Sequence, residues 1–114
     1  MKDEGRARAL IPVRATEGAA MCYGPPGTSL LFENERTRVW EVLLEPGESL
    51  AMHRHDVPYV VVTIEGSTCE LTGADGATSV VTLRPGDWEY KPPEVHALRN
   101  LGPTRFRNRF IEFK

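Results

Sequence analysis

Glycine and proline punctuation constrains the fold of this chain most strongly. From Thr28 onward, no window of helical length keeps apolar residues at positions i, i+3, i+4 and i+7 without a Gly or Pro interrupting it. The runs between the turn residues are instead rich in β-branched and aromatic side chains, as in 39–43 (VWEVL) and 60–64 (VVVTI). The pattern therefore predicts an all-β protein.

Turn residues divide this part of the chain into short runs that each favour a strand. The predicted strands are 28–32, 37–45, 49–55, 58–65, 67–72, 77–83, 88–91, 95–101 and 104–113. Short strands joined by Gly and Pro turns are typical of a sandwich or barrel, and closure into a jelly roll removes exposed strand edges. The 114 residues suffice for one core, so we expect a single barrel domain over 28–114.

Residues 1–27 differ in character, since they are rich in Ala, Gly, Arg and Glu and end in the run GPPG, which continues neither helix nor strand. We interpret them as an N-terminal arm. It is either disordered or packed across a partner subunit, and the sequence does not choose between the two.

The charge pattern excludes two classes of partner. The formal net charge is −2 and the Lys and Arg residues are dispersed, which predicts no binding to nucleic acid or to an anionic membrane. No apolar run is long enough to span a membrane, and the start MKDEGRARAL lacks the apolar stretch of a secretory signal. We therefore expect a cytoplasmic protein.

The chain contains three histidines, His53, His55 and His96, and their spacing suggests a metal site. Residues i and i+2 of a strand point to the same face, so His53 and His55 can converge on one ion if residues 51–55 are extended. A His-x-His pair alone is weak evidence. The turns at Pro46-Gly47, Glu65-Gly66 and Pro85-Gly86 strengthen it, because they place every histidine on a short strand.

With these turns, the two histidine segments resemble the motifs of the cupins, small jelly-roll barrels also described as double-stranded β-helices. The cupin motifs run G-x5-H-x-H-x(3,4)-E-x6-G and G-x5-P-x-G-x2-H-x3-N. Here the first reads PGESLAMHRHDVPYVVVTIEG and the second PGDWEYKPPEVHALRN, over residues 46–100. The resemblance, closest to the small single-domain (type 2) cupins, implies one metal ion held by His53, His55 and His96.

The sequence departs from the family pattern in two places. Four residues after His55, where the family usually supplies a glutamate ligand, stands Tyr59. In the second motif Glu94 occupies the place of a glycine, and one residue fewer precedes His96. The loop is shortened, while the ending His96-x3-Asn100 survives.

Replacement of the glutamate by Tyr59 leaves two interpretations open. Three imidazoles bind late first-row metals well, with Fe or Zn favoured and Ni, Mn or Cu possible as the ion. Tyr59 would then donate a hydrogen bond near the metal as a catalytic residue, act as a weak fourth ligand, or simply pack in the barrel. In the second interpretation the site has lost its metal and the histidines only form hydrogen bonds.

Several other residues carry weaker expectations. Cys22 and Cys69 form no C-x-x-C unit, so we expect two ordinary thiols without a disulfide. Asn100 is expected to be a polar residue at a strand end. The alternating basic residues of the last strand are expected to line a solvated outer face, or to meet a carboxylate if they turn inward; they are Arg105, Arg107 and Arg109. The large aromatics are expected mostly in the core; they are Trp40, Trp88, Tyr90 and Phe110.

Two classes of function agree with these features. The first is a metal-dependent, dioxygenase-like enzyme that acts on a small chelating diketone, enol or carboxylate. The second is a non-catalytic module that binds a metal or a small molecule. An enzyme needs an acid or base near the metal, for which Tyr59 and Glu89 are the candidates, and Arg99 could bind a substrate carboxylate. By family resemblance we expect a homodimer that pairs through edge strands.

Overall fold

The structure is a computed structural model that describes residues 23–114 and contains nine strands in that range, as predicted. The observed bounds differ from the predicted ones by no more than two residues. The strands are β1 (Ser29–Glu33), β2 (Thr37–Leu44), β3 (Ser49–His55), β4 (Tyr59–Glu65), β5 (Ser67–Gly73), β6 (Thr78–Leu83), β7 (Trp88–Lys91), β8 (Glu94–Gly102) and β9 (Phe106–Phe113). The described residues contain no helix long and apolar enough to cross a membrane.

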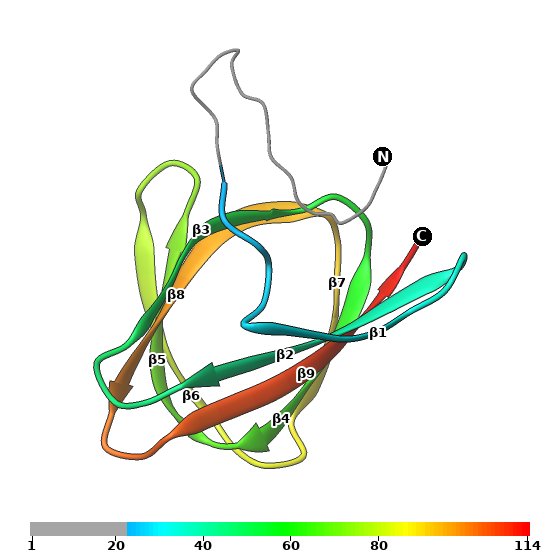
Figure 1. The fold of residues 1–114 in the computed structure, drawn as a ribbon. Coiled ribbons are helices and arrows are strands. Elements are labelled where there is room, and N and C mark those ends of the chain that lie inside the picture. The colour runs from blue at the N-terminus through cyan, green and yellow to red at the C-terminus, as the bar shows by residue number, and fades with distance from the viewer. Residues whose placement is uncertain (1–22) are drawn as a thin grey trace.

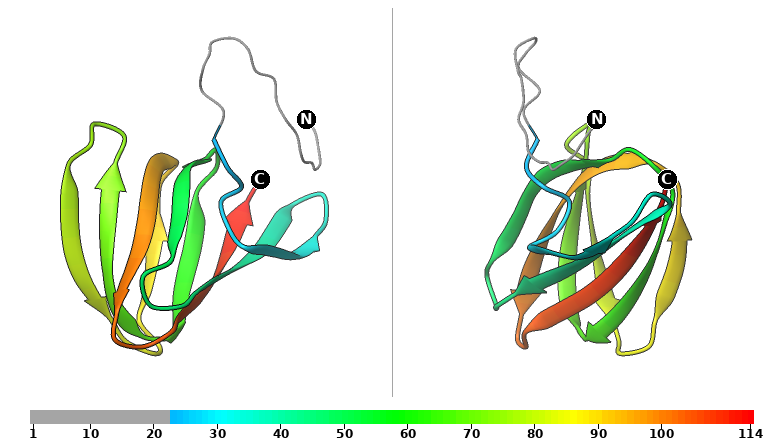
Figure 2. Two further views of the ribbon diagram at one scale, coloured as in Figure 1. Left: turned by 60° about the vertical axis from the view of Figure 1, so that its left-hand side comes forward. Right: turned by 45° about the vertical axis from the view of Figure 1, so that its right-hand side comes forward.

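The strands form two antiparallel sheets that face each other across one core. One sheet has the order β1-β2-β9-β4-β7 and the other has the order β3-β8-β5-β6. Figure 1 looks down the resulting barrel, and Figure 2 shows the β1–β2 hairpin extending away from its wall. The predicted all-β jelly-roll class is confirmed.

The motif glycines make the turns before β3, which carries His53 and His55, and before β7, which precedes the His96 strand. Gly47 and Gly86 have φ values of 87° and 89°, a conformation that side chains with a Cβ rarely adopt. Each lies in a turn closed by a backbone hydrogen bond, from Glu48 N to Glu45 O at 2.9 Å and from Asp87 N to Arg84 O at 3.0 Å. The predicted turns before β3 and β7 are therefore present.

Strand alternation builds the core and also moves two aromatics to the surface. The buried apolar side chains come from both sheets and are Val42, Leu44, Tyr59, Cys69, Leu98, Phe106 and Phe110. On β7, however, Trp88 and Tyr90 are 70% and 60% exposed, and Tyr90, which lies between the cavity-lining Glu89 and Lys91, points outward. The prediction that these two aromatics belong to the core was wrong, because β7 is an edge strand on which residues 88–90 are all exposed.

The basic residues of the last strand face outward, as expected. Buried and more exposed residues alternate along β9, and the arginines pair with carboxylates on the same outer face. Arg109 Nε lies 3.1 Å from Glu41 Oε1, and Arg107 Nε lies 2.8 Å from Glu65 Oε2. Arg105, just before the strand, also pairs with Glu65.

Cys69 is a completely buried free thiol, and burial raises its pKa to about 11, which leaves it unreactive. Cys22 and most of the predicted arm lie outside the described residues. Of that arm, residues 23–27 are described, and Gly24 forms a parallel bridge with His53 while its N–H donates to Met52 O at 3.3 Å. This segment crosses in front of the barrel in Figure 1.

Asn100 is a structural residue whose side chain is saturated with hydrogen bonds. Its Nδ2 donates to Leu44 O and Thr104 O, and its Oδ1 accepts from Ser67 Oγ and Gly102 N, all within 2.7–2.9 Å. The amide is fully buried and joins β2, β5, β8 and the loop before β9. The interpretation of Asn100 as a structural polar residue is therefore the one that its contacts support.

An Asn100→Ala variant is expected to lose about 3 kcal/mol of unfolding free energy, because it leaves several buried polar groups without a hydrogen-bond partner, at about 1 kcal/mol or more each. Urea denaturation measures this loss. The neighbouring Arg99→Ala, at an exposed position, is the control and should change the free energy by less than about 0.5 kcal/mol. Equal midpoints for the two variants would contradict the structural role.

Candidate metal centre

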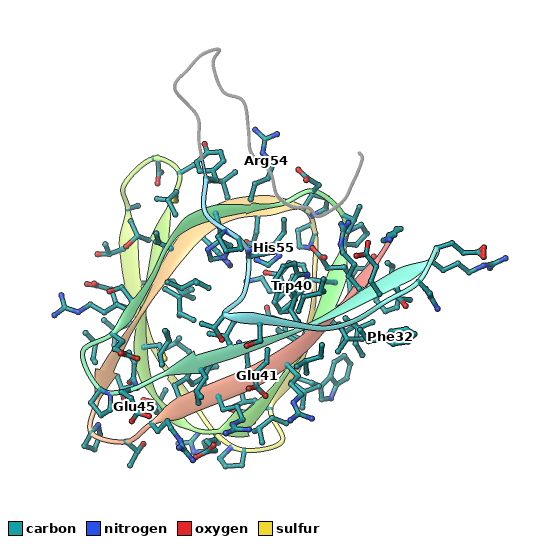
Figure 3. The ribbon with its side chains drawn as sticks, in the orientation of Figure 1. Phe32, Trp40, Glu41, Glu45, Arg54 and His55 are labelled. Atoms are coloured by element: carbon teal, nitrogen blue, oxygen red, sulfur yellow. The ribbon has the colours of Figure 1, made fainter. Side chains whose placement is uncertain are left out.

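Strand β3 directs two histidines into the barrel. His53 and His55 are 1% and 2% exposed, whereas Arg54 between them is exposed. In Figure 3, His55 points into the barrel and Arg54 points away from it. The alternation of an extended strand therefore places both imidazoles on the inner face, as predicted.

The third histidine arrives from the neighbouring strand. His96 on β8 pairs directly with His53 in the antiparallel ladder, and side chains opposite each other on paired strands share a face. One ligand atom from each of the three imidazoles can be chosen such that all lie within 4.8 Å of one another. The three histidines are thus close enough to hold one metal ion.

The distance between two ring nitrogens fits shared ligation. His55 Nε2 and His96 Nε2 lie 3.2 Å apart. Two nitrogens bound at about 2.0–2.1 Å to one ion, in tetrahedral or octahedral geometry, are about 2.8–3.4 Å apart. The His53 ring is also near, with its centroid 4.9 Å from that of His55 and 4.6 Å from that of His96.

Hydrogen bonding orients at least one imidazole for metal binding. His53 Nδ1 lies 2.8 Å from the carbonyl oxygen of Ala51, which can only accept, so Nδ1 carries the proton and Nε2 keeps its lone pair. His55 Nδ1 is buried and has no hydrogen-bond partner among residues 23–114. That nitrogen is not the one that faces His96, so Nε2 of His55 remains the metal-binding atom, and three such imidazole nitrogens fit a transition metal.

Burial keeps the three rings neutral. Desolvation lowers the pKa of His55 to about 2, with further lowering from His53, His96 and Lys91. Desolvation likewise lowers the pKa of His96 to about 4 and also lowers that of His53, where the bond to Ala51 offsets part of the effect. Since only neutral imidazole binds metal, the site is ready for an ion at neutral pH without releasing protons.

Tyr59, in the place of the family glutamate, packs on the metal-site histidine. Its ring stacks on that of His55, with centroids 4.0 Å apart and an interplanar angle of 18°. The side chain is buried, and its hydroxyl donates a short hydrogen bond to Glu94 Oε2. Desolvation and the Glu94 carboxylate raise the pKa of Tyr59 well above its usual range, so the phenol stays protonated.

The structure adds Glu94 and Lys91, neither of which was predicted as a site residue. Glu94 Oε2 lies 3.5 Å from His96 Nδ1 and 3.3 Å from Lys91 Nζ. A carboxylate beside the outer nitrogen of a histidine ligand favours the tautomer whose other nitrogen is free for the metal. The signal for Glu94 was present in the sequence, because it stands two residues before His96 on one strand. Lys91 lies opposite Tyr59 across the β4–β7 pair.

A cavity of about 630 Å³ lies inside the barrel beside the three histidines. Its wall includes apolar side chains such as Val61 and Phe110, and a few polar ones, a composition typical of small-molecule sites. Glu89, one of the two residues predicted as a candidate acid or base, is among the residues that line this cavity. Arg99 is exposed and is not among the lining residues, so it is not placed to bind a ligand there.

The chain resembles solved structures of cupins. A cupin domain from Bordetella pertussis is 30% identical, with a TM-score of 0.70 and coverage of 75% of this chain and 90% of that one. An RmlC-like cupin family protein from Methanocaldococcus jannaschii is 19% identical (TM-score 0.60, coverage 74% and 75%). A conserved protein from Klebsiella pneumoniae with a double-stranded β-helix domain is 22% identical (TM-score 0.60, coverage 78% and 80%).

No protein-family model and no curated protein matches the sequence. The assignment therefore depends on the solved structures, on the two-sheet barrel and on the position of the three histidines within it. An identity of 30% over nine tenths of the Bordetella domain is sufficient to establish the relationship. The chain belongs to the cupin superfamily.

Proposed function

We propose that this cupin binds one divalent transition-metal ion through His53, His55 and His96 and acts as a dioxygenase-like enzyme on a small chelating diketone, enol or carboxylate. The observation that carries the proposal is the convergence of three neutral imidazoles on the wall of the cavity inside the barrel. Fe or Zn is the favoured ion, with Ni, Mn or Cu as alternatives, and the oxygen-dependent reaction requires a redox-active ion such as Fe, because Zn has no redox chemistry. Such an ion would act as a Lewis acid and orient the substrate.

The chain's own residues supply substrate binding and proton handling in this proposal. Lys91 lines the cavity near the histidines and would attract an anionic substrate, since the three imidazole ligands carry no charge. Tyr59 is the proposed catalytic residue. Its protonated hydroxyl, held by Glu94, would donate a hydrogen bond to the charge that develops on the substrate. Val61 and Phe110 would keep water from the reacting atoms.

The alternative is a non-catalytic cupin module that binds a metal or a small molecule. One observation favours it: Glu94, the carboxylate nearest the histidines, already contacts Tyr59 and Lys91. A general base must be free to accept a proton from the substrate. The carboxylates in the cavity lining are Asp87 and Glu89, and because Asp87 already accepts from Arg84 N, Glu89 is the one left to act as a base.

Elemental analysis of untagged protein, purified without chelator, tests the proposal. We expect close to one transition-metal ion per chain, and oxygen uptake when small diketones or enols are added to the loaded protein. A near-stoichiometric metal without oxygen uptake over a broad panel would favour the binding module. Metal far below stoichiometry, not restored by Fe, Zn, Ni or Mn, would contradict the metal site itself.

We also propose that the protein is a homodimer that pairs at the outer face of the five-stranded sheet. Phe32, Tyr90 and Ile111 lie in one row across this face and are 54%, 60% and 36% exposed. The two arginines of β9 on this face, Arg107 and Arg109, are paired with carboxylates of the same face. Neither is therefore left unpaired to attract a partner protein of opposite charge. An apolar, internally neutralised face suits a second copy of itself. The cytoplasmic location stays a prediction from the sequence.

Light scattering after gel filtration tests the dimer. We expect twice the chain mass of 12.7 kDa for the native protein and a shift toward the monomer for Tyr90→Glu, which introduces an uncompensated charge at the interface. Val80 is the matched control, because it is 62% exposed but lies on β6 in the other sheet. A dimer that survives Tyr90→Glu but not Val80→Glu would move the interface to the four-stranded sheet.

A further inference from the structure

Asn108 is a buried polar residue in an otherwise largely apolar row. It lies on β9 between Phe106 and Phe110, and all three side chains point into the barrel. Asn108 is 8% exposed and lines the same cavity as the histidines. Its partners in the ladders are Val42 on β2 and Thr63 on β4, which line the cavity too.

The amide of Asn108 is incompletely satisfied. Its Oδ1 is buried and has no hydrogen-bond partner among residues 23–114. Asn100, also inside the barrel, shows the usual arrangement, because both its amide atoms are saturated. Buried polar atoms without partners are rare in folded proteins, and a side chain that carries one and lines a cavity is a candidate for ligand contacts.

The position of Asn108 relative to the histidines sets the length of a ligand. Phe110, the next inward residue of β9, contacts the rings of His55 and Tyr59, with centroids 5.1 Å and 5.4 Å away. Two residues along an extended strand span about 6.8 Å. Asn108 therefore lies one inward position farther along the barrel than the ring that touches the metal site, and the apolar side chains of Val42 and Val61 lie beside this path.

We propose that Asn108 forms a second recognition point and that the ligand has two polar ends. One end chelates the metal at the histidines, a short apolar segment packs against Phe110 and Val61, and the other end carries a hydroxyl or N–H group that donates to Asn108 Oδ1. This inference rests on the proposed metal site and narrows its substrate class. It excludes chelators that end in a plain hydrocarbon as the preferred ligands.

A matched pair of probes tests the proposal by calorimetry on metal-loaded protein. The probes are 6-hydroxyhexanohydroxamic acid and heptanohydroxamic acid, which share the chelating group and chain length but end in a hydroxyl and a methyl group. The native protein is expected to bind the hydroxyl probe about tenfold more tightly, the effect of one hydrogen bond of ordinary net strength. Asn108→Leu, which keeps the size of the side chain, should abolish or reverse this preference.

Leu71→Ile is the control, because Leu71 lines the cavity away from the proposed ligand path and the change alters no polar group, so the preference should survive in it. Equal affinities of the two probes for the native protein, or an unchanged preference in Asn108→Leu, would overturn the proposal. In either case, binding of both probes would still support the metal site, and only the role of Asn108 would be refuted. If neither probe binds and no metal is retained, the proposed function fails instead.

A second measurement does not depend on metal. In chelator-treated protein, Asn108→Leu replaces an unsatisfied buried amide with an apolar group, so we expect Tm to rise by about 4 to 8 °C. A fall in Tm would mean that the amide stabilises the barrel itself, and would overturn the proposal whatever the metal content. The rise in Tm and the loss of the hydroxyl preference together would identify a group kept for binding at a cost in stability.

Discussion

Replacing His96 with alanine is expected to weaken metal binding by more than about 100-fold, because even the loss of an outer hydrogen-bond partner costs 10- to 100-fold and His96 is a proposed direct ligand. His96 Nε2 faces His55 Nε2 at 3.2 Å, so the variant leaves at most two imidazoles for the ion. His53→Ala should have a similar effect. Competition titration against a fluorescent chelator measures the dissociation constant, and elemental analysis gives the occupancy.

Tyr59→Phe is the matched control for the histidine variants. It keeps the ring that stacks on His55 and removes only the hydroxyl that donates to Glu94. We expect metal affinity to change by less than about tenfold, since the lost hydrogen bond goes to Glu94 and not directly to a histidine ligand. A drop as large as that of His96→Ala would make Tyr59 a ligand. Full occupancy in both His53→Ala and His96→Ala would refute the three-histidine site.

The barrel and the histidine cluster were predictable from the sequence because both follow from local patterns. Gly47 and Gly86 mark turns by their backbone freedom, and the runs between turns are short and β-branched. The spacing of His53 and His55 by two residues then places both on one face. His96 required the family resemblance, because its pairing with His53 joins residues 43 positions apart.

The remaining site residues depend on strand order and register, which the local pattern does not contain. Lys91 meets Tyr59 because β7 pairs with β4, and Asn108 reaches the cavity because β9 lies between β2 and β4. Strand alternation alone places Glu94 on the same face as His96, because the two residues are two positions apart, although the family motif has a glycine at the position of Glu94. Trp88 is exposed because β7 is an edge strand, and the size of the side chain does not reveal that position.

The metal-free protein is expected to lose stability steeply as the pH falls below about 6.5. The folded state lowers the pKa of His55 to about 2 and that of His96 to about 4, while an unfolded histidine titrates near 6.5. The unfolded chain therefore binds protons that the folded chain does not. The stabilisation is complete above pH 6.5 and is lost at about 1.4 kcal/mol per pH unit for each histidine.

Between pH 7.5 and pH 5.0 we therefore expect the unfolding free energy of chelator-treated protein to fall by about 4 kcal/mol, and by more if His53 contributes fully. Urea denaturation at several pH values measures it, and the range stops at pH 5.0 to avoid most carboxylate titration. His55→Gln removes one titrating ring and should give a clearly shallower slope. A free energy independent of pH would mean that the histidines accept protons in the folded barrel, which the burial of His53 and His55 at 1% and 2% exposure opposes.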